Sequence, residues 1–180
     1  PYAQHNLGVM YYFGLGTDQD YASAASWYEK AAKQGHADAA YKIGLMRKKG
    51  LGAEQDAAAA ASWYALAAEK GHPNAQYSLG LMHEQGLGVK RDEAAAADWY
   101  RKAAEQGHVK AQHHLALCYE QGKGIPKNPV EACVWYSLAA MGGDEASGRS
   151  REILGLSLSP DELSQVERLV AKRRAGYQKR

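Results

Sequence analysis

Histidines are the residues of this sequence most able to hold a metal ion or transfer protons, and the chain has seven of them. His36, His72 and His108 recur at a spacing of 36 residues. Residues one repeat apart are separated by about 8–10 Å, the distance between packed helices, whereas zinc ligands lie about 2 Å from the ion. His113 and His114 are adjacent and point in different directions on a helix, so only one of them could be a ligand. We therefore expect no metal site and interpret the three spaced histidines as turn residues.

Motifs that would indicate an enzyme are missing from the sequence. It contains no Gly-x-Ser-x-Gly, no Ser-x-x-Lys and no phosphate-binding glycine loop. Its Gly-x-Gly segments do not follow a predicted strand, which a nucleotide-binding loop would require. We therefore expect no catalytic residue and no cofactor.

A block that begins with Trp-Tyr organises the chain, because it returns every 36 residues. It runs from Trp27 to His36 and recurs from Trp63 to His72, from Trp99 to His108 and, more loosely, from Trp135 to Gly143. A period of about 20 to 50 residues is typical of a solenoid, whose units bury their apolar faces against one another. The sequence therefore predicts one elongated, all-α array rather than a domain with a central core.

Each repeat is divided into two helices, which we call helix A and helix B. Helix A is followed by a Gly-x-Gly segment whose glycines can adopt the left-handed conformation that ends a helix, at residues 14–16, 50–52, 86–88 and 122–124. Helix B begins at a residue whose side chain can accept hydrogen bonds from the free N–H groups of the first turn. These residues are Asp20, Asp56, Asp92 and Asn128.

Small residues indicate that the two helices of a repeat pack closely. Alanine runs such as 57–61 in helix B bury little area each, but they let two backbones approach, as Gly8, Gly44 and Gly80 of helix A also do. A large apolar surface is still needed to fill the core. We expect the tryptophans of helix B to supply it, and stacking on a ligand is their alternative role. They are Trp27, Trp63, Trp99 and Trp135.

The two cysteines, Cys118 and Cys133, lie at positions where the other repeats have methionine and alanine. They are either two buried thiols that pack as small apolar residues, or a disulfide between helix A and helix B of the fourth repeat. A disulfide would indicate an oxidising compartment, the periplasm or the outside of the cell. This is the only argument for export in the sequence.

The repeat pattern changes after Gly143. Residues 146–156 have the character of a fifth helix A, and Ser159-Pro160-Asp161-Glu162 begins a last helix with a serine cap and a glutamate three residues later. We predict an array over residues 1–154, followed by a capping helix and basic tail over residues 155–180. Its repeats are expected at about 1–36, 37–72, 73–108 and 109–143, with a partial repeat at 144–154.

Charge and hydropathy exclude several classes of partner. Lys and Arg number 22 against 20 Asp and Glu, and the two signs are interleaved, which argues against a nucleic-acid-binding surface. A local basic cluster, Lys172 to Arg174 with Lys179 and Arg180, is interpreted as a solvated helix end. No run of about 18 apolar residues is present, so no membrane span is expected.

Residues 1–4 align with residues 73–76, so we expect the natural N-terminus and any targeting segment to lie upstream.

The repeat unit resembles the Sel1-like repeat, a relative of tetratricopeptide arrays with slightly longer units. The residues that carry the resemblance are Ala-Gln-Tyr-Ser-Leu-Gly-Leu-Met, Gly-Leu-Gly-Val and Trp-Tyr-Arg-Lys-Ala-Ala-Glu-Gln-Gly-His within residues 75–108, and the likeness covers about residues 1–154. Arg47 and His83 depart from it where Tyr11 and Tyr119 show the usual aromatic, and Ala116 replaces a glycine.

The resemblance implies a right-handed α/α superhelix of about four to five helix pairs. It also implies a bacterial adaptor or scaffold that acts in signalling, envelope assembly or contact with a host. Some cysteine-rich relatives are linked to β-lactam binding, so a hydrolase of the β-lactamase type is the alternative function.

A partner protein is expected on the concave side, which helix A lines in superhelices of this kind. Aromatic and aliphatic side chains with a few charges of both signs suit an extended peptide or an amphipathic helix. The predicted binding residues are Tyr2, His5, Tyr12, Tyr41, Leu45, Lys48, Tyr77, Leu81, Glu84, His113 and Leu117. The alternative is that His5, Tyr41, Tyr77, His113 and the aliphatic residues pack between neighbouring repeats.

The first helix also presents a face that a further repeat would cover, so we expect an upstream repeat or end-to-end self-association.

Overall fold

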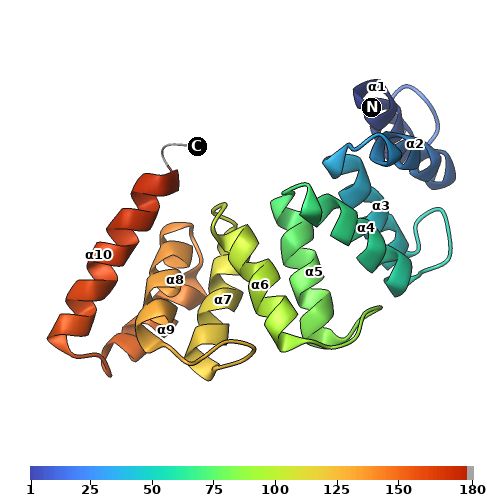
Figure 1. The fold of residues 1–180 in the computed structure, drawn as a ribbon. Coiled ribbons are helices and arrows are strands. Elements are labelled where there is room, and N and C mark those ends of the chain that lie inside the picture. Colours follow the sequence, from blue (N-terminus) through green and yellow to red (C-terminus); the bar gives the residue numbers. More distant parts are fainter. Residues whose placement is uncertain (178–180) are drawn as a thin grey trace. The chain divides into compact units, whose positions relative to one another are not determined.

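The structure, a computed structural model, describes residues 1–177, which form ten α-helices and no strand (Figure 1). Helix A of the successive repeats is α1 (Tyr2–Phe13), α3 (Ala37–Lys49), α5 (Pro73–Gln85), α7 (Val109–Gln121) and α9 (Glu145–Gly155). Helix B is α2 (Tyr21–Lys33), α4 (Ala57–Glu69), α6 (Glu93–Ala104), α8 (Pro129–Met141) and α10 (Pro160–Tyr177). Lys179 and Arg180 of the predicted basic tail lie outside the described residues.

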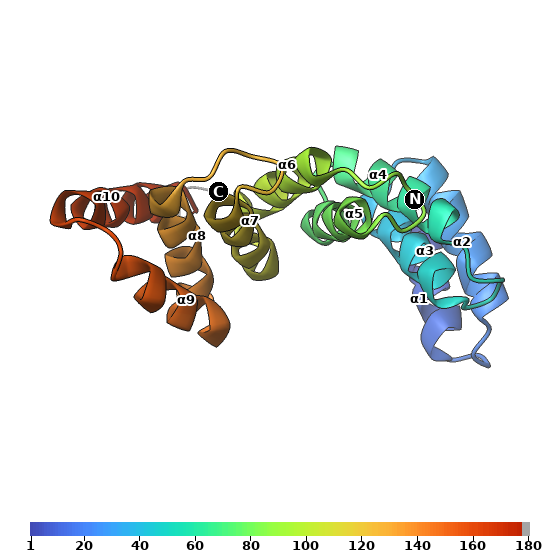
Figure 2. The same cartoon turned by 90° about the horizontal axis from the view of Figure 1, so that it is seen from below.

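The chain divides into two compact units, Pro1–Arg91 and the residues from Asp92 onward. In the N-terminal unit α1 packs on α2 and α3 on α4, and the pairs are joined through α2 on α3 and α4 on α5. In the C-terminal unit α6 packs on α7, α7 on α8 and α8 on α9. Within each unit, helices therefore pack on their neighbours in chain order, as Figures 1 and 2 show. This confirms the predicted all-α helix-pair solenoid.

The predicted helix boundaries are confirmed by their hydrogen bonds. The Asp56 carboxylate accepts a bond of 2.9 Å from the backbone N–H of Ala59 at the start of α4. Gly50 ends α3 in the left-handed conformation with φ of 69°, and its N–H donates to the Met46 carbonyl. Side-chain caps also begin α2 at Asp20, α6 at Asp92 and α8 at Asn128. The local sequence therefore determines where these helices start and stop.

The core of each repeat is filled by the tyrosine of the Trp-Tyr pair. Tyr28, Tyr64, Tyr100 and Tyr136 are at most 1% exposed. The prediction that tryptophan fills the core is wrong in three repeats, because Trp27, Trp63 and Trp99 are only half-buried.

The reason is helical phase. Tyr64 shares a face with Ala60, Ala67 and Ala68, which are all buried, whereas Trp63 lies one position earlier and so points about 100° away. Burial also opposes ionisation of the core tyrosines and raises the pKa of Tyr28 to about 12.

A glycine in helix A makes room for each core tyrosine in the N-terminal unit. A Cβ atom at Gly44 would lie 2.6 Å from Cδ1 of Tyr64, and one at Gly8 would lie equally close to Tyr28. Real Cβ atoms do not approach a ring carbon so closely, so an added methyl group would force the two helices apart. Close pairing of helix A with helix B therefore depends on these glycines.

The second glycine of the Gly-x-Gly turn joins consecutive repeats. Gly52 has φ of +74°, and a Cβ there would lie 2.5 Å from the carbonyl carbon of Tyr21, at the start of α2 in the preceding repeat. Gly88 lies in the same way against Ala57. The turn thus both ends helix A and brings its backbone against the previous helix B.

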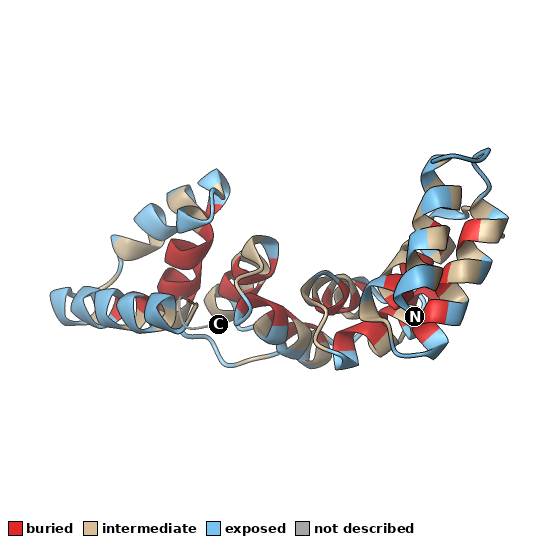
Figure 3. Ribbon diagram, turned by 90° about the horizontal axis from the view of Figure 1, so that it is seen from above, coloured by how far each residue is buried: buried red, intermediate tan, exposed pale blue. Residues whose placement is uncertain are grey.

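The last helix, α10, covers the final repeat by packing on α8. Its start is the predicted capping box, in which Glu162 accepts a bond of 2.8 Å from the Ser159 N–H and the Glu162 N–H donates to the Ser159 hydroxyl. Val166 and Val170 are the buried residues of α10. Figure 3 shows that α8 is buried along most of its length.

The first helix, α1, leaves its apolar side exposed. Tyr2 is 75% exposed, Phe13 57% and Met10 39%, whereas the equivalent Met46 and Met82 are 1% exposed. Contact of this side with a further repeat or a second chain stays a prediction.

Within residues 1–177, no helix combines the length and the apolar character needed to cross a membrane.

Truncation of the two neighbouring aromatic residues in α4 should separate their roles. We expect Tyr64→Ala to lower the free energy of unfolding by about 3–5 kcal/mol, because it empties a buried site. Trp63→Ala should cost about 1–2 kcal/mol, because only part of the indole leaves water on folding. Urea unfolding followed by circular dichroism measures both. Equal losses would contradict the assignment of tyrosine as the core residue.

Candidate partner-binding face

The predicted binding residues all lie on helix A, and they differ in exposure. Tyr2 and Lys48 are exposed. The remaining ones are half-buried, namely His5, Tyr12, Tyr41, Leu45, Tyr77, Leu81, Glu84, His113 and Leu117. The half-buried side chains each have one side against the protein, so the contacts on that side decide which of them are available to a partner.

Two rings of the predicted face stack on the start of the next repeat. The Tyr41 ring lies 4.6 Å from the His72 ring, nearly parallel to it, and the His5 ring lies 4.5 Å from the His36 ring. Burial raises the pKa of the Tyr41 hydroxyl. The interpretation that these residues pack between neighbouring repeats is therefore observed for Tyr41 and His5.

Other aromatic members of the set are also held by the protein. Tyr12 packs edge-on against Phe13 and Tyr21, with ring centroids 4.8 Å and 5.2 Å away. Burial, with a smaller contribution from the Glu84 carboxylate, raises the pKa of Tyr77. Substitution at either tyrosine would therefore disturb folding as well as any binding.

Leu45 and Lys48 are two neighbouring members of the set on α3. They are three residues apart, so they lie on one face of the helix, and Lys48 projects into solvent while Leu45 is half-buried. Leu81 on α5 and Leu117 on α7 occupy the position of Leu45 in their own repeats and are also half-buried. Helix A therefore offers an aliphatic position with a charged neighbour.

His113 joins α7 to α9 through a cluster with Ser147 and Asp144. Its Nδ1 atom lies 2.8 Å from the Ser147 hydroxyl and 3.1 Å from Oδ2 of Asp144. Ser147 is fully buried and its hydroxyl donates to Asp144. A nucleophilic serine would need access to substrate and contact with the other ring nitrogen of the histidine. This cluster is therefore a helix cap and not a nucleophile with its base.

The three spaced histidines cap helix A of the following repeat. Nδ1 of His36, His72 and His108 accepts a hydrogen bond of 3.1–3.2 Å from the backbone N–H three residues later. This agrees with their interpretation as turn residues and assigns each a specific acceptor role. Within residues 1–177, no group of three or more His, Cys, Asp or Glu side chains could hold a metal ion.

Both cysteines are buried thiols, and no disulfide joins them. The Cys133 thiol points at the Arg151 carbonyl, 4.0 Å away, and burial raises its pKa. The structure therefore contains no Cys118–Cys133 bridge, and the argument for export that depended on this bridge has no structural support.

The interpretation of the last basic cluster as a solvated helix end is wrong for Arg173. Its guanidinium lies 4.5 Å from the centroid of the Trp135 ring, and Nη2 donates to both carboxylate oxygens of Glu131, at 3.2 Å and 3.0 Å. Trp135 is only 3% exposed, unlike the other three tryptophans. Arg173 thus attaches α10 to α8, an interaction between residues too far apart in sequence for any local pattern to indicate.

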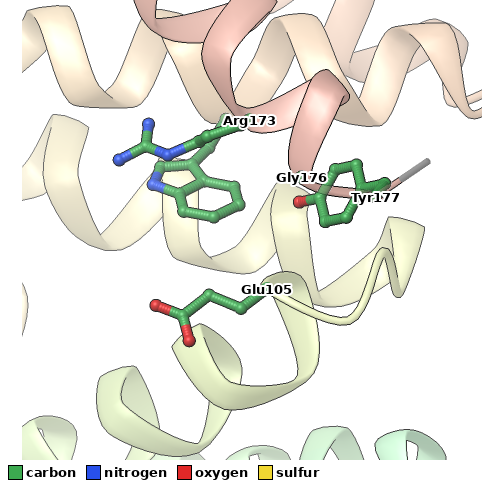
Figure 4. Close-up of a pocket in the computed structure, with 5 residues that line it drawn as sticks. Glu105, Arg173, Gly176 and Tyr177 are labelled. Atoms are coloured by element: carbon green, nitrogen blue, oxygen red, sulfur yellow. The ribbon is translucent and has the colours of Figure 1, made fainter. Parts of the chain in front are cut away.

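A small cleft of about 190 Å³ lies beside this contact, lined by Glu105, Trp135, Arg173, Gly176 and Tyr177 (Figure 4). The Tyr177 hydroxyl donates to the Ala104 carbonyl at 2.8 Å and accepts from the Gln112 amide at 3.1 Å. These bonds fix the end of α10 against α6 and α7. None of the predicted binding residues lines the cleft.

Comparison with known proteins identifies the repeat. The family model for the Sel1 repeat matches four consecutive segments, residues 1–36, 37–72, 73–108 and 109–144. The chain belongs to the Sel1 repeat family. Proteins built from Sel1 repeats generally mediate protein–protein interactions. A search of curated proteins finds no match.

Solved structures of Sel1 repeat proteins are closely similar to this one. One is a protective antigen of uropathogenic Escherichia coli strains, with a TM-score of 0.85 and 34% identity over 96% of this chain. This chain spans only 38% of that protein's chain. Another is a Sel1 repeat protein from Oxalobacter formigenes, with a TM-score of 0.83, 33% identity, and coverage of 96% of this chain and 73% of that chain.

An immunity protein from Pseudomonas aeruginosa is more distant. It has a TM-score of 0.51 and 21% identity, with coverage of 99% of this chain and 67% of that chain. At this identity the likeness shows only that the two proteins share a fold.

Removal of the Arg173 side chain should weaken the attachment of α10 to α8. We expect Arg173→Ala to lower the free energy of unfolding of the C-terminal unit by about 1–3 kcal/mol, since it leaves Glu131 and the Trp135 ring without their half-buried partner. Arg174→Ala is the matched control, because Arg174 is exposed, and it should change stability by less than about 0.5 kcal/mol. Urea unfolding followed by indole fluorescence reports both, and equal effects would contradict the docking role of Arg173.

Proposed function

We propose that this chain is a protein-interaction scaffold that binds a peptide or an amphipathic helix on helix A. The observation that carries the proposal is the pairing of Leu45 with Lys48 on α3, with Leu81 and Leu117 at the equivalent aliphatic position. An aliphatic group beside a charge provides both buried contact area and orientation for a partner segment. Membership of the Sel1 repeat family supports a protein partner.

Helix B differs from helix A, because its apolar face is buried inside the protein. The buried face of α4 consists of Ala60, Ala61, Tyr64, Ala67 and Ala68, which are used inside the protein. In helix A, by comparison, Leu45 and Leu81 remain half-exposed after the repeats have stacked. Half-exposed aliphatic residues in equivalent positions are suited to an external helix or strand, which binds through several anchors at once.

A peptide selection tests the proposal. Peptides of 12 residues are selected from a random display library on the purified protein, and their affinities are measured by fluorescence anisotropy. We expect Leu45→Gln and Lys48→Glu each to weaken the selected peptides by about tenfold, since anchor residues at an interface typically contribute more than about 1 kcal/mol. The melting temperature should change little with Lys48→Glu, because Lys48 is exposed, and fall by only a few degrees with Leu45→Gln, because Leu45 is half-buried.

Glu69→Lys is the control, since Glu69 is an exposed charge of the same repeat but lies on helix B, at the end of α4. It should leave affinity within about twofold of the parent protein. Selected peptides that lose binding with Glu69→Lys but not with Leu45→Gln and Lys48→Glu would contradict this choice of face.

A further inference from the structure

Histidine caps make the helix A starts dependent on a neutral imidazole. Nδ1 of His36 accepts from the Ala39 N–H at 3.2 Å, and Nδ1 of His72 accepts from the Ala75 N–H at the same distance. A ring nitrogen accepts a hydrogen bond only while it carries no proton, so each neutral ring must hold its proton on Nε2. Protonation of the ring removes the acceptor and adds a positive charge at the positive end of the helix dipole.

The same rings also join consecutive repeats of the N-terminal unit. Nε2 of His72 lies 3.1 Å from Oδ1 of Asp38 on α3, which fixes the proton on Nε2, and the ring stacks on Tyr41 of the same helix. Lys42 is the other charged group that faces His72. The His36 ring stacks on His5 and meets Tyr2 edge-on, with the Asp38 carboxylate as a nearby charge. Loss of a cap therefore disturbs the contact between two repeats.

The last junction of the chain has the opposite arrangement. Asp144 takes the place of the capping histidine and accepts a bond of 3.0 Å from the Ser147 N–H. The histidine lies on the preceding helix A, where Nδ1 of His113 contacts both Asp144 and Ser147. Because the Ser147 hydroxyl donates to Asp144, it accepts from the Nδ1–H of His113. This junction therefore uses a ring N–H as donor and needs no unprotonated ring nitrogen as acceptor, unlike the starts of α3 and α5.

We propose that acidification from about pH 7.5 to 5.5 releases the histidine-capped starts of α3 and α5 while the aspartate-capped start of α9 stays closed. The N-terminal unit would thereby carry an acid-sensitive pair of repeat junctions. The proposal does not depend on the proposed binding function, because every contact in it is internal to the chain.

Burial supports the direction of the effect. It lowers the pKa of His36 and of His72 below the usual value, and for His72 the Asp38 carboxylate opposes this only in part. The folded state therefore binds fewer protons than the unfolded state in this range, so stability is full above about pH 6.5 and falls as the pH drops below it. The pKa values of Asp20, Asp144 and Glu162 are lowered as well, but protonation of those carboxyl groups reduces the stability of the protein only in more acidic solution.

Amide hydrogen exchange, followed by nuclear magnetic resonance, tests the proposal on the whole chain. Protection factors, which remove the intrinsic effect of pH on exchange, are measured at pH 7.5 and 5.5 for the capped amides of Ala39, Ala75 and Ser147. We expect protection at Ala39 to fall by roughly fivefold on acidification, which corresponds to the loss of a typical cap. Protection at Ala75 should fall by less, because its N–H also donates to the His72 carbonyl at 3.1 Å, and protection at Ser147 should stay constant.

The double variant His36→Asn and His72→Asn is the control, because asparagine accepts the same bond without titrating, as Asn128 does at the start of α8. Its protection at Ala39 and Ala75 should be equal at the two pH values. Constant protection in the parent protein would overturn the proposal. So would an equal fall at Ser147, or a fall in the double variant as large as in the parent.

Discussion

The close contact between a glycine of helix A and the core tyrosine of helix B is the constraint on which the repeats of the N-terminal unit depend. Tyr64 fills the space beside Gly44, where a Cβ atom would lie 2.6 Å from the ring. The alanines of α4 allow the same approach but contribute little apolar area each, and the tyrosine is the largest fully buried side chain of each repeat. In the fourth repeat Ala116 takes the glycine position and is itself fully buried.

Two further devices join one repeat to the next. The second glycine of each turn lies against the start of the preceding helix B, as Gly52 does against Tyr21. A capping side chain then binds the start of helix A while its ring or carboxylate contacts the preceding helix A, as His72 does with Asp38 and Tyr41. Because these devices use the inner part of helix A, its remaining exposed positions, such as Lys48, are the ones available to a partner.

Local sequence determines a large part of this fold. The caps at Asp20, Asp56 and Asn128 and the left-handed glycines at the ends of helix A act within four residues, so the sequence indicates them directly. The choice between Trp63 and Tyr64 as the core residue was predicted wrongly, because both recur with the same period. The buried alanines in phase with Tyr64 are the signal that could have decided it. The contacts of Arg173 with Trp135 and of His113 with Asp144 could not be predicted in this way, because they depend on which residues distant in the sequence meet in the fold. The second contact also removes His113 from the side chains available for binding.

A double-mutant cycle between Gly44 and Tyr64 tests the central claim most directly. Gly44→Ala, Tyr64→Leu and the double variant are compared by urea unfolding, with Gly176→Ala as the control glycine, since a Cβ there meets nothing within 4 Å. If the methyl group and the ring compete for one space, the smaller leucine should relieve the cost of Gly44→Ala, giving a coupling energy of about 1–3 kcal/mol. Gly176→Ala should be additive with Tyr64→Leu. Additivity within about 0.5 kcal/mol for Gly44→Ala as well would contradict the account.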